Sequence, residues 1–137
     1  MAKKLSEFNT DNTSHVGACI VKNGILLSMG YNKLVPLIGD VNVPLDNSSS
    51  NILEKRNSYI LHAEQVAVFS YKGNIQDFKG ATIYLNISPC HECTKMLVAI
   101  GIKEVVYAEE YHREDMWKMS KILLDKCGIK YRLYVEE

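Results

Sequence analysis

The sequence lacks both a long apolar run and an excess of charge of either sign. None of its apolar stretches reaches the roughly 18 residues that a membrane-spanning helix needs, and the polar residues 1–9 lack the apolar core of a signal peptide. Lys and Arg together number 16, as do Asp and Glu, so the basic footprint of a nucleic-acid-binding protein is missing. We therefore expect a cytoplasmic protein with no membrane and no nucleic-acid partner.

Cysteine is also scarce, with only four in 137 residues. Cys90 and Cys93 form a Cys-x-x-Cys pair, which in a reducing compartment indicates metal or redox chemistry before a disulfide. Cys19 and Cys127 lie among apolar residues, and we expect both in the core. A chain of this length fits one domain, residues 1–137, and can bury roughly 68% of its unfolded surface without disulfides.

Hydrophobic periodicity and turn residues predict an alternation of strands and helices. The expected strands are 16–21, 25–31, 81–87, 103–108 and 129–135, and the expected helices are 62–71, 89–100 and 113–126, with a further short helix around 3–8. Asn23-Gly24 predicts a hairpin turn between the first two strands. Residues 33–57 are predicted to form a long irregular loop, and loops of this length in a compact domain are usually functional. The order predicts an α/β fold, a three-layer α/β/α sandwich with a mixed five-stranded sheet.

One group of residues has the types and spacing of a catalytic metal site. His62-Ala-Glu64 is followed, 26 residues after the Glu, by Cys90 in the sequence Pro-Cys-His-Glu-Cys. His62, Cys90 and Cys93 offer three ligands to Zn²⁺ and leave a fourth position open, which is typical of catalytic zinc. Glu64 is of no use to a zinc that only stabilises the fold, but a zinc that activates water needs such a proton carrier.

A structural zinc site would need a fourth Cys or His. His91 adjoins Cys90 and points about 100° away from it on a helix, so it is a poor fourth ligand. The remaining candidates have no metal-ligand spacing: His15, Cys19, His112 and Cys127. A catalytic zinc is therefore favoured over a structural zinc or a metal-free site.

The pattern His-x-Glu…Pro-Cys-x-x-Cys is the signature of the zinc-dependent nucleobase deaminases. Beyond it, the chain resembles the deoxycytidylate (dCMP) deaminases of the cytidine deaminase-like superfamily, from Val16 to Arg132. The stretches that carry the resemblance are Val16–Val21, Gly30-Tyr31-Asn32, His62-Ala63-Glu64, Ser88–Lys95, Gly101–Tyr107 and Tyr111-His112.

This resemblance implies hydrolysis of dCMP to dUMP and ammonia, which supplies dUMP for thymidylate synthesis. It implies a bound Zn²⁺ and a homo-oligomer, a hexamer or a dimer. By position it makes His62, Cys90 and Cys93 the metal ligands and Glu64 the catalytic residue. Four further residues match substrate contacts: Asn32, Ala63, Ser88 and Tyr111.

The sequence does not identify the residue that binds a 5′-phosphate. Lys55 and Arg56 lie just before the helix that His62 opens, and Arg56 is our candidate for this contact. The alternative is that both are solvated loop charges.

Two positions depart from the family pattern. Lys33 stands where relatives have the Gly of Gly-Tyr-Asn-Gly, and Val66 stands where they have Asn. In regulated members the Gly-Tyr-Asn-Gly loop helps to form the effector site. We therefore expect control by dCTP and dTTP to be weak or absent, while the catalytic set is intact.

Other functions remain open at this stage. A tRNA adenosine deaminase shares the zinc pattern, but it needs a basic surface and differs within and after the Cys-x-x-Cys. A free cytidine or deoxycytidine deaminase usually has Cys in place of His62. A non-catalytic nucleotide-binding relative would not need Glu64.

Overall fold

The computed structural model describes residues 16–36, 38 and 42–135. Its central element is a mixed five-stranded sheet. The short helix expected around 3–8 lies outside the described residues. The strand order is β2-β1-β5-β6-β7, formed by β1 (Gly17–Lys22), β2 (Ile25–Tyr31), β5 (Thr82–Ile87), β6 (Glu104–Glu109) and β7 (Lys130–Leu133). The five expected strands are therefore confirmed, with bounds that shift by one or two residues.

The hairpin between β1 and β2 follows from the backbone of its two turn residues. Asn23 has φ 52° and Gly24 has φ 78°, the left-handed conformations that a two-residue type I′ turn requires. Asn and Gly adopt them with little strain, so the hairpin is confirmed where Asn-Gly predicts it.

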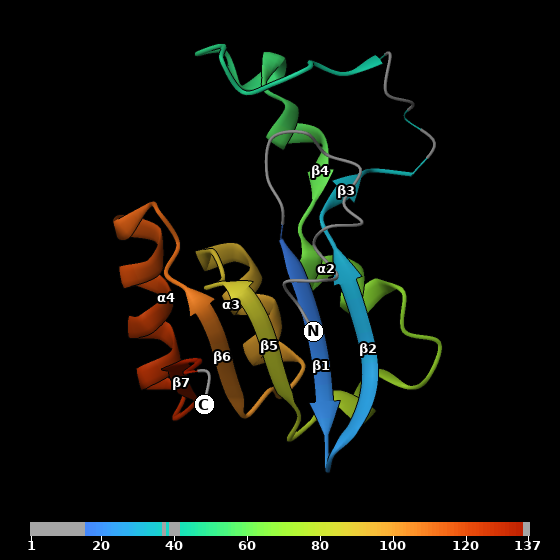
Figure 1. The fold of residues 1–137 in the computed structure, drawn as a ribbon, viewed down its shortest axis with the longest axis vertical. Coiled ribbons are helices and arrows are strands. Elements are labelled where there is room, and N and C mark those ends of the chain that lie inside the picture. Colours follow the sequence, from blue (N-terminus) through green and yellow to red (C-terminus); the bar gives the residue numbers. More distant parts are fainter. Residues whose placement is uncertain (1–15, 37, 39–41, 136–137) are drawn as a thin grey trace.

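Strand direction brings distant parts of the chain to one edge of the sheet. β1 runs antiparallel to β2 and to β5, whereas β5, β6 and β7 run parallel. The start of β1, the end of β2 and the ends of β5 and β6 therefore share an edge (Figure 1). In open α/β sheets the carboxyl ends of parallel strands are where ligands bind.

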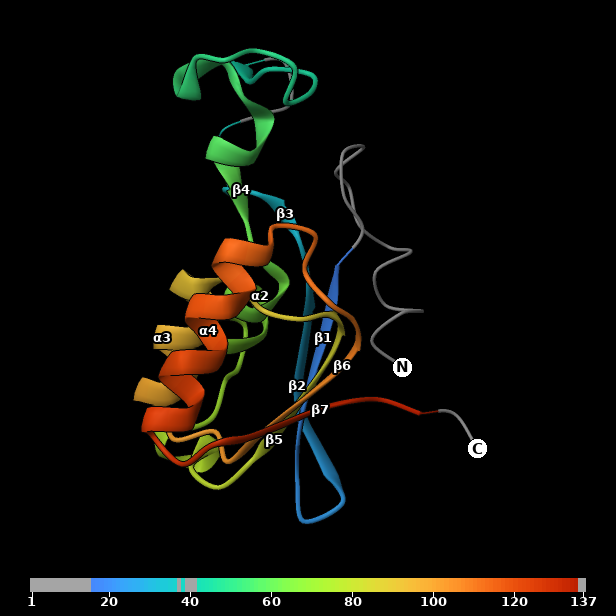
Figure 2. The same ribbon diagram turned by 90° about the vertical axis from the view of Figure 1, so that its left-hand side faces the viewer.

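Three helices cover one face of this sheet: α2 (Ala63–Phe69), α3 (His91–Ala99) and α4 (Glu114–Lys126), as Figure 2 shows edge-on. The buried side chains between helices and sheet include Ala18, Ile20, Ile83, Leu97 and Val105. The expected α/β fold with a mixed five-stranded sheet is confirmed, and the α-helices of the described residues all lie on this one face.

Several local expectations need correction. The predicted helix 89–100 places Pro89 in its first turn, but α3 begins later. The N-cap of α3 is Cys90, so Pro89 lies just before the helix. The helix expected over 62–71 is only two turns long, because His62 is its N-cap and Ser70 its C-cap. Cys19 is buried as expected, but Cys127 is exposed, since it caps the end of α4 rather than facing the sheet.

Residues 33–36, 38 and 42–61, called the projecting segment below, extend beyond the edge of the sheet that the strand ends share (Figure 1). This segment is held at its base by a two-stranded ladder of β3 (Lys33–Leu34) and β4 (Ile60–Leu61), with 3₁₀ turns η2 (Ile52–Glu54) and η3 (Arg56–Tyr59) between them. The irregular loop expected at 33–57 thus contains short regular elements among its described residues. A further 3₁₀ turn, η4 (Ile75–Phe78), follows α2.

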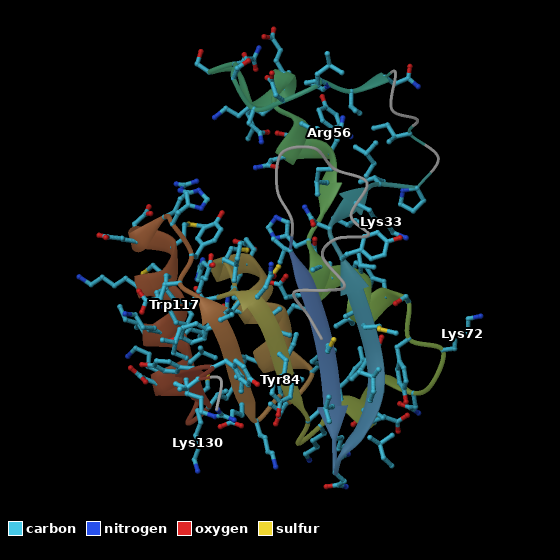
Figure 3. The ribbon with its side chains drawn as sticks, viewed as in Figure 1. Lys33, Arg56, Lys72, Tyr84, Trp117 and Lys130 are labelled. Atoms are coloured by element: carbon cyan, nitrogen blue, oxygen red, sulfur yellow. The ribbon has the colours of Figure 1, made fainter. Side chains whose placement is uncertain are left out.

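Arg56 lies inside this projecting segment (Figure 3). Its side chain is only 2% exposed, and Nη1 donates to the carbonyl of Pro44 at 3.2 Å. Its backbone N–H donates to the carbonyl of Asp46 at 2.9 Å. Arg56 is therefore an internal support of the segment, and the reading of it as a solvated loop charge is wrong.

Within the described part of the chain, no helix combines the length and the apolar character needed to cross a membrane.

Substitution at Gly30 tests how closely α2 packs on β2. A Cβ there would lie 2.5 Å from the backbone N of Ala67 and 2.7 Å from the carbonyl O of Ala63. Backbone cannot move aside as a side chain does, so we expect Gly30→Ala to lower the free energy of unfolding by about 3 kcal/mol. Urea denaturation of the purified variant measures this loss.

The matched control is Gly24→Asn, because a Cβ at Gly24 meets nothing within 4 Å and Asn tolerates its positive φ. We expect this control to change stability by less than about 1 kcal/mol. Equal denaturation midpoints for Gly30→Ala and the unsubstituted chain would contradict the close packing of α2 on β2.

Candidate functional site

The N-terminal ends of two helices meet at the shared edge of the sheet and bring three ligand side chains together. His62 is the N-cap of α2, Cys90 is the N-cap of α3, and Cys93 lies in the first turn of α3. The orientation of His62 is supported by its own backbone N–H, which donates to the side chain of Gln65 at 2.8 Å. The N-terminal ends of α2 and α3 therefore meet at the three ligand side chains.

The three ligand atoms lie close together, at separations slightly shorter than those of a set bound to one tetrahedral zinc. His62 Nδ1 lies 3.1 Å from Cys93 Sγ and 3.4 Å from Cys90 Sγ, and all three atoms lie within 4.8 Å of one another. Ligands bound to zinc at roughly 2.0–2.3 Å are about 3.5–3.8 Å apart. Two sulfurs and one imidazole nitrogen are also the donor types that zinc prefers. The residues present therefore fit a zinc ion with three protein ligands.

Electrostatics at the site favour the metal-binding thiolate at Cys90 and the neutral thiol at Cys93. The Cys93 side chain hydrogen-bonds Cys90 Sγ, and with the neighbouring His62 it lowers the pKa of the Cys90 thiol to about 4. The Cys93 backbone N–H, at the start of α3, also donates to Cys90 Sγ at 3.4 Å. The hydrogen bond with Cys90 and burial raise the pKa of the Cys93 thiol, so this site has to release the Cys93 proton when it takes up a metal.

Glu64 lies beside the ligands without being one of them. Its side chain is 3% exposed, and burial raises the pKa of its carboxyl above the ordinary value. A buried carboxyl with a raised pKa holds a proton more readily than a solvated one, which suits a group that accepts a proton and returns it. This is the property that the sequence leads us to expect of the residue two positions after His62.

A cavity of about 410 Å³ opens beside the ligands, within the usual size range for small-molecule sites. Its walls come from both sheet and helices, with the projecting segment and the loop after β6 adding the rest. The lining residues are Val16, Asn32, Asn57, Ile60, His62, Ala63, Glu64, Ile87, Ser88, Cys90, Tyr111 and His112.

Four of the five expected substrate contacts line this cavity, namely Asn32, Ala63, Ser88 and Tyr111. The fifth, Arg56, is not among the lining residues. Its guanidinium is used inside the projecting segment, where it donates to Pro44. The sequence shows that Arg56 is close to His62 along the chain, but it does not show where the Arg56 side chain points.

Two of the lining polar residues hold the cavity wall in shape. The Asn32 Oδ1 accepts from the backbone N–H of Val16 at 3.0 Å, which ties the end of β2 to the start of β1. The Ser88 hydroxyl accepts from the backbone N–H of Tyr111 at 2.6 Å, and the Ser88 N–H donates to the carbonyl of Glu109 at 2.8 Å. These bonds fix Tyr111 over the end of β5.

Sequence reasoning misses a buried polar contact behind the cysteines. The Thr94 hydroxyl lies 2.8 Å from the carbonyl of Cys90 and 3.0 Å from the hydroxyl of Ser120, which lies 3.1 Å from the carbonyl of Pro89. Thr94 and Ser120 are both fully buried, so this contact locks the start of α3 to α4. A hydroxyl at an inward helical position, as at Ser120, is the only sequence signal for it.

Asn57 and His112 also line the cavity, although the sequence does not single them out as contacts. They come from η3 and from the loop after β6, two segments that only the folded chain brings together.

Comparison with known proteins finds similarity to cytidine and deoxycytidylate deaminases. Residues 1–109 match the family model described as the cytidine and deoxycytidylate deaminase zinc-binding region. The deoxycytidylate deaminase of Pongo abelii is 33% identical over 127 residues, which cover 91% of this chain and 70% of that protein. The human deoxycytidylate deaminase is 32% identical over the same shares of the two chains.

A solved structure is also similar. It is that of the dCMP deaminase from the cyanophage S-TIM5 in complex with dCMP and dUMP, with a TM-score of 0.73 and 28% identity. The match covers 97% of this chain and 90% of that one, so both the sheet and the site lie inside it.

Removal of one sulfur ligand tests the metal centre. We expect Cys93→Ser to lose both metal and stability, because the binding free energy of a metal that holds two helices together is also folding free energy. Elemental analysis of the purified protein measures about one zinc per chain before the substitution, and thermal unfolding measures the loss of stability.

The matched control is Cys19→Ser, a buried cysteine without a metal-ligand position. It lowers stability through its hydroxyl but keeps its zinc. Stoichiometric metal in a protein that lacks both Cys90 and Cys93 would overturn this assignment of the ligands.

Proposed function

Because this chain belongs to the cytidine and deoxycytidylate deaminase zinc-binding family, we propose that it converts dCMP and water into dUMP and ammonia at the site described above. The observation that carries the proposal is the convergence of His62, Cys90 and Cys93 on one point, with the buried Glu64 beside them at the base of a nucleotide-sized cavity.

In this reaction His62, Cys90 and Cys93 hold Zn²⁺, which supplies Lewis-acid activation of water when bound. The cytosine ring enters the cavity with C4 toward the ligands. Water adds its oxygen to C4, the bond between C4 and the amino nitrogen breaks, and ammonia leaves. A carbonyl at C4 remains, which is the uracil of dUMP.

Glu64 moves the protons. Its carboxylate takes the first proton of the attacking water and delivers it to N3, and then takes the remaining proton of that oxygen and delivers it to the departing amine. Burial raises the pKa of this carboxyl, which makes it a better proton acceptor than a solvated glutamate. The same burial keeps bulk water away from the proton while it is held.

The remaining cavity walls orient the nucleotide. We assign Asn32 to the sugar and Ala63 and Ser88 to the base, and we place Tyr111 against the nucleotide. The fixed positions of Asn32 and Ser88 support this, because their bonds to Val16 and Tyr111 pre-organise the wall before substrate arrives.

The alternative activities are less well supported. The relatives reported above act on deoxycytidylate by name, and the balanced net charge of the chain gives no support for a tRNA substrate. A non-catalytic relative would have no reason to retain a buried carboxyl that costs folding free energy.

Several wider properties belong to the same proposal. We propose one catalytic domain over 1–137 that works in the cytoplasm as a homo-oligomer without a nucleic-acid partner. The exposed apolar side chains of the edge strand β2, Ile25 and Met29, support self-association, because edge strands with apolar residues are usually covered.

One assay tests the activity. The purified zinc protein is incubated with dCMP, deoxycytidine, cytidine and a tRNA fragment, and ammonia release is followed. We expect dCMP to give the highest kcat/KM. Turnover of the tRNA fragment alone, or of none of the four, would overturn the proposal.

Glu64→Gln tests the proton carrier. We expect the variant to keep its zinc but to lose turnover by at least 10²–10⁴-fold, the usual contribution of a general acid–base group. Because burial raises the pKa of Glu64, its ionised form costs stability as the pH rises through that pKa. The neutral Gln removes this cost, so the melting temperature at neutral pH is not lowered. A kcat within tenfold of the unsubstituted enzyme would remove Glu64 from the mechanism.

Weak or absent activation by dCTP is the expected regulatory behaviour. Lys33 lies in β3, where a side chain fills space that glycine leaves open, and the apolar Val66 cannot replace an amide that hydrogen-bonds. The measurement is the dCMP saturation curve with and without dCTP and Mg²⁺. A sigmoidal curve that dCTP makes hyperbolic would show that an effector site survives these substitutions.

A further inference from the structure

The helix α4 reaches the metal site from behind without supplying a ligand to it. In the part of the chain that the structure describes, α4 contributes none of the three ligand residues and none of the residues that line the cavity. It lies beside α3, as Figure 2 shows, and one of its side chains contacts the backbone just before Cys90. That side chain is Ser120, whose hydroxyl lies 3.1 Å from the carbonyl oxygen of Pro89.

Ser120 is a small polar residue on the buried face of α4. The buried residues of this helix are Trp117, Ser120 and Leu124, which lie three and four positions apart and so share one face. Trp117, labelled in Figure 3, packs edge-on against Tyr107 and Tyr131, with ring centroids 5.0 Å and 5.8 Å away. A hydroxyl buried on such a face lowers stability unless it has a hydrogen-bond partner.

Two carbonyl oxygens lie within reach of the Ser120 hydroxyl, which has one hydrogen to donate. The Met116 carbonyl, at 3.1 Å, lies inside α4 and receives a backbone N–H from the helix ladder. The Pro89 carbonyl precedes Cys90, the N-cap of α3, so the N–H groups of that helix do not reach it. Pro89 is also fully buried, and an unpaired buried carbonyl is costly. The hydrogen bond to Pro89 therefore stabilises the fold more than one to Met116.

Thr94 fixes the Ser120 hydroxyl from the other side. The Thr94 hydroxyl lies 3.0 Å from Ser120 Oγ, and the Thr94 backbone N–H donates to the Cys90 carbonyl at 2.9 Å. With Thr94 donating to Ser120 and Ser120 donating to Pro89, the two successive carbonyls of Pro89 and Cys90 each have a donor. These carbonyls flank the Cα atom of Cys90, so their bonds fix the direction in which its Sγ leaves the backbone.

A metal ligand is sensitive to this kind of support. Ligand distances in a zinc site vary by only about 0.2 Å, so a small rotation at Cys90 moves its sulfur out of place. Groups that orient the ligands without touching the metal usually change metal affinity tenfold to a hundredfold. The hydroxyls of Thr94 and Ser120 are both completely buried, which keeps water from replacing either of them.

We propose that Thr94 and Ser120 are a positioning pair for Cys90, so that the zinc affinity of this chain depends on α4. Neither side chain binds the metal, and each acts through the backbone on one side of Cys90. The inference goes beyond the proposed deamination, because it rests on the three metal ligands and not on the nucleotide that the enzyme converts. The two proposals can therefore fail separately.

The test measures how tightly the full chain holds its zinc. Competition with a chelator of known zinc affinity gives the Kd of zinc for the unsubstituted protein, for Ser120→Ala and for Thr94→Val. We expect zinc to bind about tenfold to a hundredfold more weakly in both variants. Thr94→Ser retains the hydroxyl, and we expect it to keep the zinc affinity of the unsubstituted protein.

Leu124→Ala is the matched control on the same face of α4. Leu124 is completely buried, but its apolar side chain has no hydrogen bond to give to the chain before Cys90. We expect this control to unfold at a lower urea concentration, because it leaves a cavity, and to keep its zinc Kd. If Leu124→Ala loses as much zinc affinity as Ser120→Ala, the loss follows general stability and the inference is wrong.

Cobalt(II) in place of zinc gives a second readout, because its visible absorption bands depend on the geometry of the ligands. We expect these bands to change in Ser120→Ala and Thr94→Val but not in Leu124→Ala or Thr94→Ser. An enzyme that is active on dCMP, with zinc Kd and cobalt bands unchanged in both Ser120→Ala and Thr94→Val, would overturn this inference alone. If those two variants bind zinc more weakly but the unsubstituted chain deaminates nothing, the proposed reaction fails and the positioning pair stands.

Discussion

Everything at this site depends on two short helices that start at the same point. The ligand atoms of His62 and Cys93 are 3.1 Å apart although 31 residues separate them in the chain. On one side, α2 packs so closely on β2 that only glycine fits at position 30, and Ser28 donates to the carbonyl of Ala67. On the other side, the buried hydroxyls of Thr94 and Ser120 tie α3 to α4. The metal site is a product of this packing as much as of its ligands.

Local patterns account for most of what the sequence predicts correctly. The strand bounds, the Asn-Gly hairpin and the helix-starting positions of His62 and Cys90 follow from features within a few residues of each other. The metal ligands and Glu64 follow from their spacing, because zinc chemistry restricts both residue type and number. The resemblance to dCMP deaminases adds Asn32, Ala63, Ser88 and Tyr111, all of which line the cavity.

What the sequence does not predict depends on contacts between distant segments. Arg56 reads as a candidate phosphate contact or a solvated charge, whereas the fold buries it against Pro44. Asn57 and His112 become neighbours of one cavity only when η3 and the loop after β6 come together. The face of the sheet on which each helix lies is set by the crossover connections, so the hydrophobic periodicity predicts the helices but not their side.

The pairing of β1 with β5 has a consequence for the order of folding. Ala18 pairs with Leu85, so this ladder closes a loop of more than sixty residues, and non-local closures of that kind are slow. The β1–β2 hairpin is local and forms early, whereas α2 and α3 are brought together only after β5 has joined the sheet. During synthesis His62 therefore leaves the ribosome before Cys90 and Cys93, and the complete set of ligands exists only after β5, which lies between them, has been made.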